Sequence, residues 1–176
     1  MRVDAYPWYE CVSGEDLQQG DIIEQCPLFS PPSDLRKVKS ETTFERVTRN
    51  VIVISQSCDL VQNQKSLSQV LLCTVWDLSK FVEGHLATPK GKEDARRGNI
   101  PGMHMLGACD LDNYGRDPRI VDFRELHTLP LPFFRSVAAA SGHRIRLLPP
   151  YREHLAQAFA RFFMRVGLPV DIPPFR

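Results

Sequence analysis

The chain has 176 residues, of which 43% are apolar, so it has the length of one domain and enough hydrophobic side chains to form a core. A net charge of +1 with 24% charged residues implies neither a disordered chain nor a partner held by strong whole-molecule electrostatics. The first residues lack the apolar centre of a signal peptide, and no segment has the apolar length of a membrane span, which favours a cytoplasmic location.

The five cysteines include no pair at CxxC spacing, which argues against a disulfide framework and a standard zinc knuckle. The residues whose types suit zinc or iron are Cys58, Asp59, His104, Cys109 and Asp110. Their spacing matches no ligand motif, because His104 and Cys109 have no close partner of the same kind. We therefore predict reduced thiols, no metal site and no cofactor.

The order of apolar and polar runs predicts strands first and helices later. A strand opens at residues 20–24, and Pro27 then predicts an irregular connection up to about residue 39. The remaining predicted elements are an edge strand at 42–48, strands at 51–54 and 70–76, regular structure at 103–111 and 119–123, a short helix at 133–141, a strand at 143–148 and a helix at 150–166.

Residues 51–54 are the most informative of these runs. Four β-branched residues in a row cannot alternate between a wet and a dry face, so they predict a strand buried on both sides. The apolar run 70–76 predicts a second interior strand, and the link between the two runs is short enough to make them neighbours.

These elements predict a mainly β, β-rich α+β fold, a small curved barrel with an inserted excursion and a C-terminal helix packed on it. We expect a single domain over residues 1–176. Its parts are a barrel core at about 17–76 and 103–148, a charged surface insertion at about 77–102 and the C-terminal helix at about 150–166.

Small polar and reactive side chains follow the buried strand and form the first candidate site. They are Ser55, Gln56, Ser57, Cys58 and Asp59. A thiol beside a carboxylate needs a histidine or an arginine from elsewhere to become a nucleophile. The alternative is structural, with Cys58 as a small packed side chain and Asp59 as a cap that accepts backbone hydrogen bonds.

A second candidate site is the arginine-rich last third of the chain. Arg144 and Arg146 fall on one face of the predicted strand 143–148, and Arg152 follows on the terminal helix with Arg161 and Arg165. Such a surface can bind the phosphates of a nucleic acid. The alternative is an ordinary solvated face.

Three segments together resemble the first part of the PemK/MazF toxin family. They are Gly-Asp-Ile-Ile at 20–23, Arg-Asn-Val-Ile-Val-Ile-Ser at 49–55 and Leu-Leu-Cys-Thr-Val at 71–75, and Val-Asp-Phe-Arg at 121–124 is similar to a later strand of the family. About half of the chain is covered. The chain departs from the family in having Asn50 where a proline is usual and in the insertion at 77–102.

The resemblance implies a curved barrel that cleaves RNA by metal-independent general acid and base chemistry. By position, Arg49 matches the strand arginine of the family and Ser55 the polar residue at the strand end. RNA cleavage needs a base near the 2′-hydroxyl and a cation near the phosphate, so Asp59 is the candidate base, Arg49 or Arg124 the candidate cation, and Cys58 a further catalytic candidate.

The family also implies partners, namely RNA, a protein antitoxin or regulatory partner, and a second copy in a homodimer, in a bacterial or phage-associated setting. The alternative function is a non-catalytic binding or regulatory barrel module that contacts a protein or a nucleic acid. Both functions depend on the same expectation, that the strand ending at Ser55 is interior and that its polar tip opens onto a hollow.

Overall fold

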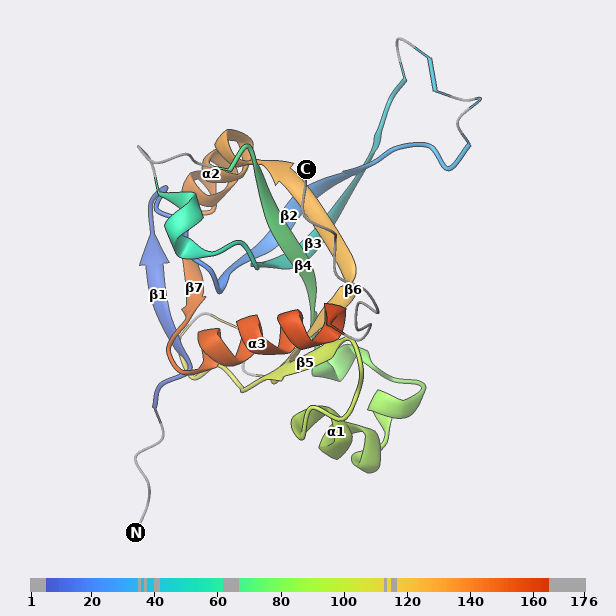
Figure 1. Ribbon diagram of the computed structural model, residues 1–176, viewed down its shortest axis with the longest axis vertical. Helices are drawn as coiled ribbons and strands as arrows, with labels where there is room; N and C mark the ends of the chain where they lie inside the picture. The colour runs from blue at the N-terminus through green and yellow to red at the C-terminus, as the bar shows by residue number, and fades with distance from the viewer. Residues whose placement is uncertain are drawn as a thin grey trace, which may run out of the picture.

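The computed structural model describes residues 6–34, 36, 38, 39, 42–61, 67–112, 114 and 117–164. Its seven strands form one antiparallel sheet in the order β1-β7-β2-β3-β4-β6-β5 (Figure 1). The strands are β1 (Tyr9–Ser13), β2 (Asp21–Ser30), β3 (Glu45–Val53), β4 (Gln69–Asp77), β5 (Met103–Leu106), β6 (Arg119–Pro130) and β7 (His143–Leu147). The helices are α1 (Pro89–Arg96), α2 (Leu131–Ala140) and α3 (Tyr151–Phe163), with short 3-10 turns at Ser57–Leu60, Leu78–Lys80 and His85–Ala87.

The predicted fold class, a β-rich α+β fold with a C-terminal helix packed on it, is confirmed. The sheet curves but its hydrogen-bonded ladder is not closed, because the order ends at β1 and β5. A side-chain contact links these two ends, since Tyr9 Oη donates to the carbonyl oxygen of Gly107 at 2.8 Å. The ring of Trp8 lies so close to Gly107 that a Cβ atom there would come within 2.5 Å of it.

The middle of the sheet is buried on both faces, as the run of β-branched residues predicted. Val51, Ile52 and Val53 are 0% exposed. Ile52 and Ile54 belong to the core cluster on the α3 side, whereas Val51 and Val53 belong to the cluster that α2 covers. Side chains that alternate along one strand therefore fill two separate hydrophobic layers.

Two strands differ from their predicted limits. β3 is one continuous strand, so the predicted edge strand at 42–48 and the buried run are parts of the same element. β2 continues through Pro27, which was expected to end it, after a bulge at Glu24 and Gln25 where Gln25 has φ of 53°. Beyond Ile22, β2 pairs only with β3, so Pro27 lies on an open edge where a missing amide breaks no ladder hydrogen bond. Figure 1 shows β2 and β3 projecting together from the body of the molecule.

The excursion at 77–102 folds against the outer strands. Leu86 and Ala95 pack on Ile120 of β6 in a small core of their own. The segment begins with a 3-10 turn at Leu78–Lys80, and helix α1 forms in its charged part. Thr88 begins α1, because its hydroxyl accepts the amide of Gly91 at 3.0 Å. No helix among the described residues combines the length and apolar character needed to cross a bilayer.

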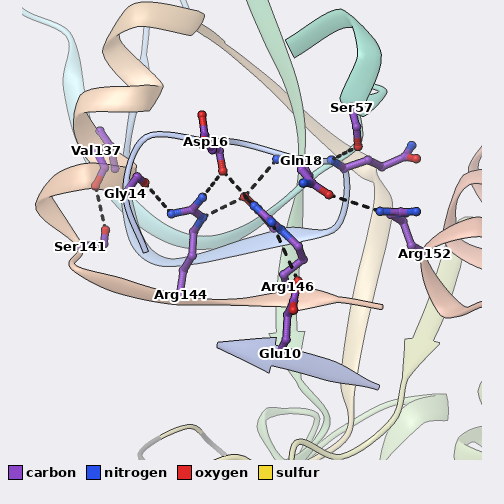
Figure 2. Close-up of polar contacts among 12 residues, drawn as sticks. Glu10, Gly14, Asp16, Gln18, Ser57, Val137, Ser141, Arg144, Arg146 and Arg152 are labelled. Atoms are coloured by element: carbon purple, nitrogen blue, oxygen red, sulfur yellow. Dashed lines mark hydrogen bonds and ion pairs between the residues drawn. The ribbon is translucent and has the colours of Figure 1, made fainter. Parts of the chain in front are cut away.

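The expected basic face of β7 is buried, which corrects its reading as a surface. Arg144 and Arg146 are 2% and 8% exposed, and both guanidinium groups bind the carboxylate of Asp21, which is fully buried. Arg144 Nε donates to Asp21 Oδ2 at 2.9 Å, and Arg146 Nη2 donates to the same oxygen at 3.0 Å. The remaining donors reach the carbonyl oxygens of Gly14 and Asp16 (Figure 2). We call Asp21, Arg144 and Arg146 the buried charge cluster.

Removing the charge of Asp21 is expected to destabilise the fold strongly. The substitution Asp21→Asn leaves two buried guanidinium groups against one carboxamide, and the loss of one partner from a buried ion pair costs about 3–5 kcal/mol. Urea unfolding followed by circular dichroism measures this loss. The control is Asp34→Asn, which removes a carboxylate paired with Arg36 on the surface. A similar fall in both variants would contradict a special role for the buried charge cluster.

Candidate functional site

The polar tip of β3 opens onto a hollow, as expected from the sequence. A cavity of about 420 Å³ lies between the loop that precedes β2, the 3-10 turn at Ser57–Leu60 and helix α2. The loop contributes Glu15–Gln18, the turn contributes Ser57 and Cys58, and α2 contributes Arg135. We call this hollow the strand-end cavity.

Ser55 and Ser57 hold the backbone at this tip. Ser55 is 8% exposed, and its hydroxyl accepts the amide of Leu71 at 2.9 Å. Ser57 Oγ accepts the amide of Gln19 at 3.1 Å, and the Gln19 carboxamide donates to the carbonyl oxygen of Ile54 at 2.8 Å. Ser55 does not line the cavity, so its hydroxyl orders the turn and does not face a ligand.

Cys58 and Asp59 are exposed, and their neighbours supply no activating cation. The Cys58 thiol lies 3.7 Å from Gln56 Oε1 and 3.7 Å from Asp59 Oδ1, which are both acceptors. Arg135 lines the same cavity, but its Nη2 donates to the carbonyl oxygen of Leu60 at 2.6 Å. Among the described residues, the geometry therefore gives the thiol a carboxylate neighbour, which raises its pKa in general, but no histidine or arginine to activate it as a nucleophile.

Within the described parts of the chain, no hydrogen bond or ion pair joins Asp59, Arg49 and Arg124 to one another. Arg124 projects from β6 and binds Asp122, with its Nε 2.8 Å from Asp122 Oδ1. Arg49 lies on β3, opposite Cys26 of β2. Each of the three residues thus has a separate setting.

The arginine in the first turn of α3 also has local partners. Arg152 pairs with Glu153 at 2.9 Å. Its Nη1 also lies 3.4 Å from Gln18 Oε1, and Figure 2 draws this second contact. The predicted basic surface of Arg144, Arg146 and Arg152 does not form. Arg144 and Arg146 are buried, where both bind the carboxylate of Asp21. Arg165 lies outside the described residues.

Arg49 instead meets an aromatic ring and an imidazole on one face of the sheet. Its guanidinium carbon lies 5.8 Å from the centroid of the Trp76 ring. On the neighbouring strand, His127 Nε2 is 2.9 Å from Thr74 Oγ1. We call Arg49, Thr74, Trp76 and His127 the Arg49 cluster. Three adjacent strands, β3, β4 and β6, supply its members.

The antiparallel registers explain why these residues meet. Val51 of β3 pairs with Thr74 of β4. Because the strands are antiparallel, Arg49, two residues before Val51, lies opposite Trp76, two residues after Thr74. Across β4, Leu72 pairs with His127, which makes Thr74 a diagonal neighbour of the imidazole on the same face. Thr74 is fully buried, whereas Trp76 and His127 are half-buried and Arg49 is exposed.

The environment lowers the pKa of His127 below its ordinary value. Burial is the main cause because it disfavours the charged imidazolium, and the positive charge of Arg49 acts in the same direction. The carboxylate of Glu125 opposes them. His127 is therefore mostly neutral near pH 7 and is able to accept a proton.

Sequence reasoning identified Arg49 but missed the other members of the Arg49 cluster. Thr74 and Trp76 lie in a run that was interpreted as continuously apolar, and His127 lies beyond the predicted strand 119–123. Alternation along β4 places Leu72, Thr74 and Trp76 on one face, and this pattern was the available signal. It does not tell which strands lie beside β4, so it could not bring Arg49 or His127 next to Trp76.

Metal-ligating side chains do not gather in the part of the chain that the structure describes. No group of three or more histidine, cysteine, aspartate or glutamate side chains there is close enough to hold an ion. The zinc or iron alternative built on Cys58, His104 and Cys109 therefore has no geometric support.

Comparison of the chain with protein-family models, with curated proteins and with solved structures finds no match in any of the three. The resemblance to the PemK/MazF family thus stays a prediction from the sequence.

Removing the charge of Arg49 is expected to raise the pKa of His127. In the wild-type protein, burial and Arg49 together hold this pKa below its ordinary value, so Arg49→Gln removes one of the two depressing causes. An NMR titration of the imidazole carbon and nitrogen shifts measures the change. Arg46→Gln is the control, because Arg46 projects from the opposite face of β3. An unchanged His127 pKa in Arg49→Gln would show that the two side chains do not interact.

The accessibility of the strand-end tip is testable by thiol labelling. In the native protein only Cys11 and Cys58 are exposed, whereas Cys26, Cys73 and Cys109 are buried. Burial also raises the pKa of Cys26 and Cys73 to about 12, so little thiolate forms there. We expect two thiols to react rapidly with a disulfide reagent in native protein and one in Cys58→Ser. Slow reaction of Cys58 would mean that the tip is closed.

Proposed function

We propose that this protein binds single-stranded RNA on the Arg49 cluster and cleaves it without a metal ion. The observation that carries the proposal is the position of Arg49 over Trp76, beside a histidine of lowered pKa that is hydrogen-bonded to Thr74. The proposal agrees with the RNA-cleaving toxin function that the PemK/MazF resemblance suggests, and it changes the proposed base from Asp59 to His127.

The cluster offers the two contacts that single-stranded RNA needs. A half-buried Trp76 ring supplies a surface on which an unstacked base stacks. The guanidinium of Arg49 is exposed beside that ring; its Nη1 donates to the carbonyl oxygen of Thr48 at 2.9 Å, and its other donors are available to contact a phosphate.

The chemistry assigned to His127 is general base catalysis. When Nε2 carries the hydrogen and donates to Thr74 Oγ1, Nδ1 has a free lone pair. Nδ1 takes the proton of a ribose 2′-hydroxyl, the 2′ oxygen attacks phosphorus, and the bond to the 5′ oxygen breaks. The 5′ oxygen takes a proton from solvent, which leaves a 2′,3′-cyclic phosphate and a 5′-hydroxyl. Arg49 stabilises the negative charge that builds on the phosphate oxygens.

The setting suggested by the resemblance completes the proposal. A cytoplasmic toxin of this type works with a protein antitoxin and acts as a homodimer. The competing function is a non-catalytic module that binds RNA through Arg49 and Trp76 and leaves it intact. Cleavage assays separate the two.

Purified protein incubated with mixed single-stranded RNA in the presence of EDTA is expected to give discrete fragments ending in 2′,3′-cyclic phosphate. His127→Asn removes the base and should lower the cleavage rate about 100-fold or more with little change in RNA affinity. Trp76→Ala should weaken binding about tenfold through the loss of stacking. Arg46→Gln, on the opposite face of β3, is the control and should retain cleavage.

Two results decide against this assignment. If RNA is bound but stays intact under varied salt and metal conditions, the protein is the binding module. If Asp59→Asn abolishes cleavage while His127→Asn does not, the reaction belongs to the polar tip that follows β3 and the Arg49 cluster is not the active site.

A further inference from the structure

A second cavity, separate from the Arg49 cluster and the strand-end cavity, lies between α1, β5 and α3. Its volume is about 370 Å³, which is in the lower part of the range for small-molecule pockets. The end of α1 and the turn that follows it form one wall, and α3 forms the opposite wall. We call it the α3 cavity.

The ionisable residues that line the α3 cavity are all bases. They are Arg96, Arg97, His104, His154 and Arg161, and no aspartate or glutamate lines the space. His154, Gln157 and Arg161 follow one another at helical spacing, so one face of α3 presents them to the cavity. The cavity therefore has a single sign of charge.

The nearest carboxylate does not neutralise these bases. Glu93 accepts Arg96 Nε at 2.7 Å and Arg97 Nε at 2.6 Å, so one carboxylate serves two guanidinium groups. Arg161 has no ion-pair partner within the described ranges. Two positive charges thus remain before either histidine takes a proton.

The other carboxylates on the surrounding elements are already paired. Asp94 of α1 binds His85 at 3.0 Å, and Glu153 of α3 binds Arg152 at 2.9 Å. Neither carboxylate lines the cavity. The α3 cavity therefore keeps a net positive charge in the folded protein, and this charge favours an anionic ligand.

The rest of the wall is apolar and aromatic. The His104 ring lies parallel to that of Phe123, with an angle of 15° and a centroid separation of 6.3 Å. Phe162 completes this side, and Gly102 lies against it with φ of +80°, where a Cβ atom would come within 3.0 Å of the Phe162 ring. The glycine thus allows the turn to follow the aromatic wall closely.

His104 provides a polar group on this apolar wall. Burial lowers its pKa to about 4, with a further contribution from the charge of His154, so the imidazole is neutral near pH 7. Its ring nitrogens have no hydrogen-bond partner among the residues that the structure describes. A neutral imidazole is able to donate one hydrogen bond and accept another from a ligand.

We propose that the α3 cavity binds a small phosphate-bearing ligand of the nucleoside monophosphate class. Arg97 and Arg161 face the phosphate from opposite walls, since guanidinium groups suit bidentate contacts with phosphate oxygens. The base lies against Phe162 and the His104 ring, which offers a hydrogen bond to its edge. This proposal is independent of the proposed RNA cleavage, because the two sites share no residue.

Isothermal titration of the full chain with AMP, GMP, CMP and UMP tests the site. We expect at least one of them to bind with about tenfold or greater preference over inorganic phosphate and over the matching nucleoside. Arg161→Gln should weaken this binding about tenfold or more without changing the thermal unfolding midpoint, because Arg161 has no ion pair to lose within the described chain. Lys92→Gln, on an α1 residue outside the cavity lining, is the matched control.

The Arg49→Gln variant distinguishes the two sites. If it retains mononucleotide binding while Arg161→Gln loses it, the α3 cavity is the site whether or not the protein cleaves RNA. The proposal is overturned if Arg49→Gln alone abolishes binding, if inorganic phosphate binds as well as the nucleotides, or if no mononucleotide binds at millimolar concentration.

Discussion

The buried carboxylate of Asp21 is the constraint on which the rest of this fold depends. An unpaired charge inside a protein costs several kcal/mol, so Asp21 and Arg144 are tolerated in the core only together. The pairing also fixes strand register, because Asp21 is opposite Arg146 and Ile22 is opposite Ile145. A slip of one residue would turn both arginines to the other face and leave the carboxylate alone.

The same cluster positions the loop that forms one wall of the strand-end cavity. Carbonyl oxygens of Gly14 and Asp16 accept guanidinium hydrogens, which orders the chain between β1 and β2 (Figure 2). That loop in turn supplies Gln19, whose amide and side chain bind the tip of β3. The small polar residues that follow the buried strand are therefore largely used as backbone partners. This explains why the chemistry proposed for the molecule lies on the face of the sheet and not at the end of its central strand.

The sequence was sufficient for features that depend on local patterns. The β-branched run at 51–54 identified a strand buried on both faces, and the apolar spacing of 150–166 identified the helix observed at Tyr151–Phe163. Contacts between residues far apart in the sequence could not be predicted from it. The alternation of Arg144 and Arg146 indicates an exposed face until Asp21, more than 120 residues earlier, is known to lie opposite. Arg49 and Trp76 become neighbours only when the register of β3 on β4 is known.

A bulge in β6 explains how one strand serves two sites on opposite faces. Phe123 and His127 are four residues apart, so simple alternation would place both on the same face. The pairing with β4 shifts between Cys73 and Thr74, where Leu126 and Asp122 are the partners and three residues of β6 are unpaired. An odd number of inserted residues reverses the alternation, which turns Phe123 toward α3 and His127 toward the Arg49 cluster. Without the bulge, the imidazole would point toward the α3 side, and the Arg49 cluster would keep a cation and a ring but have no base.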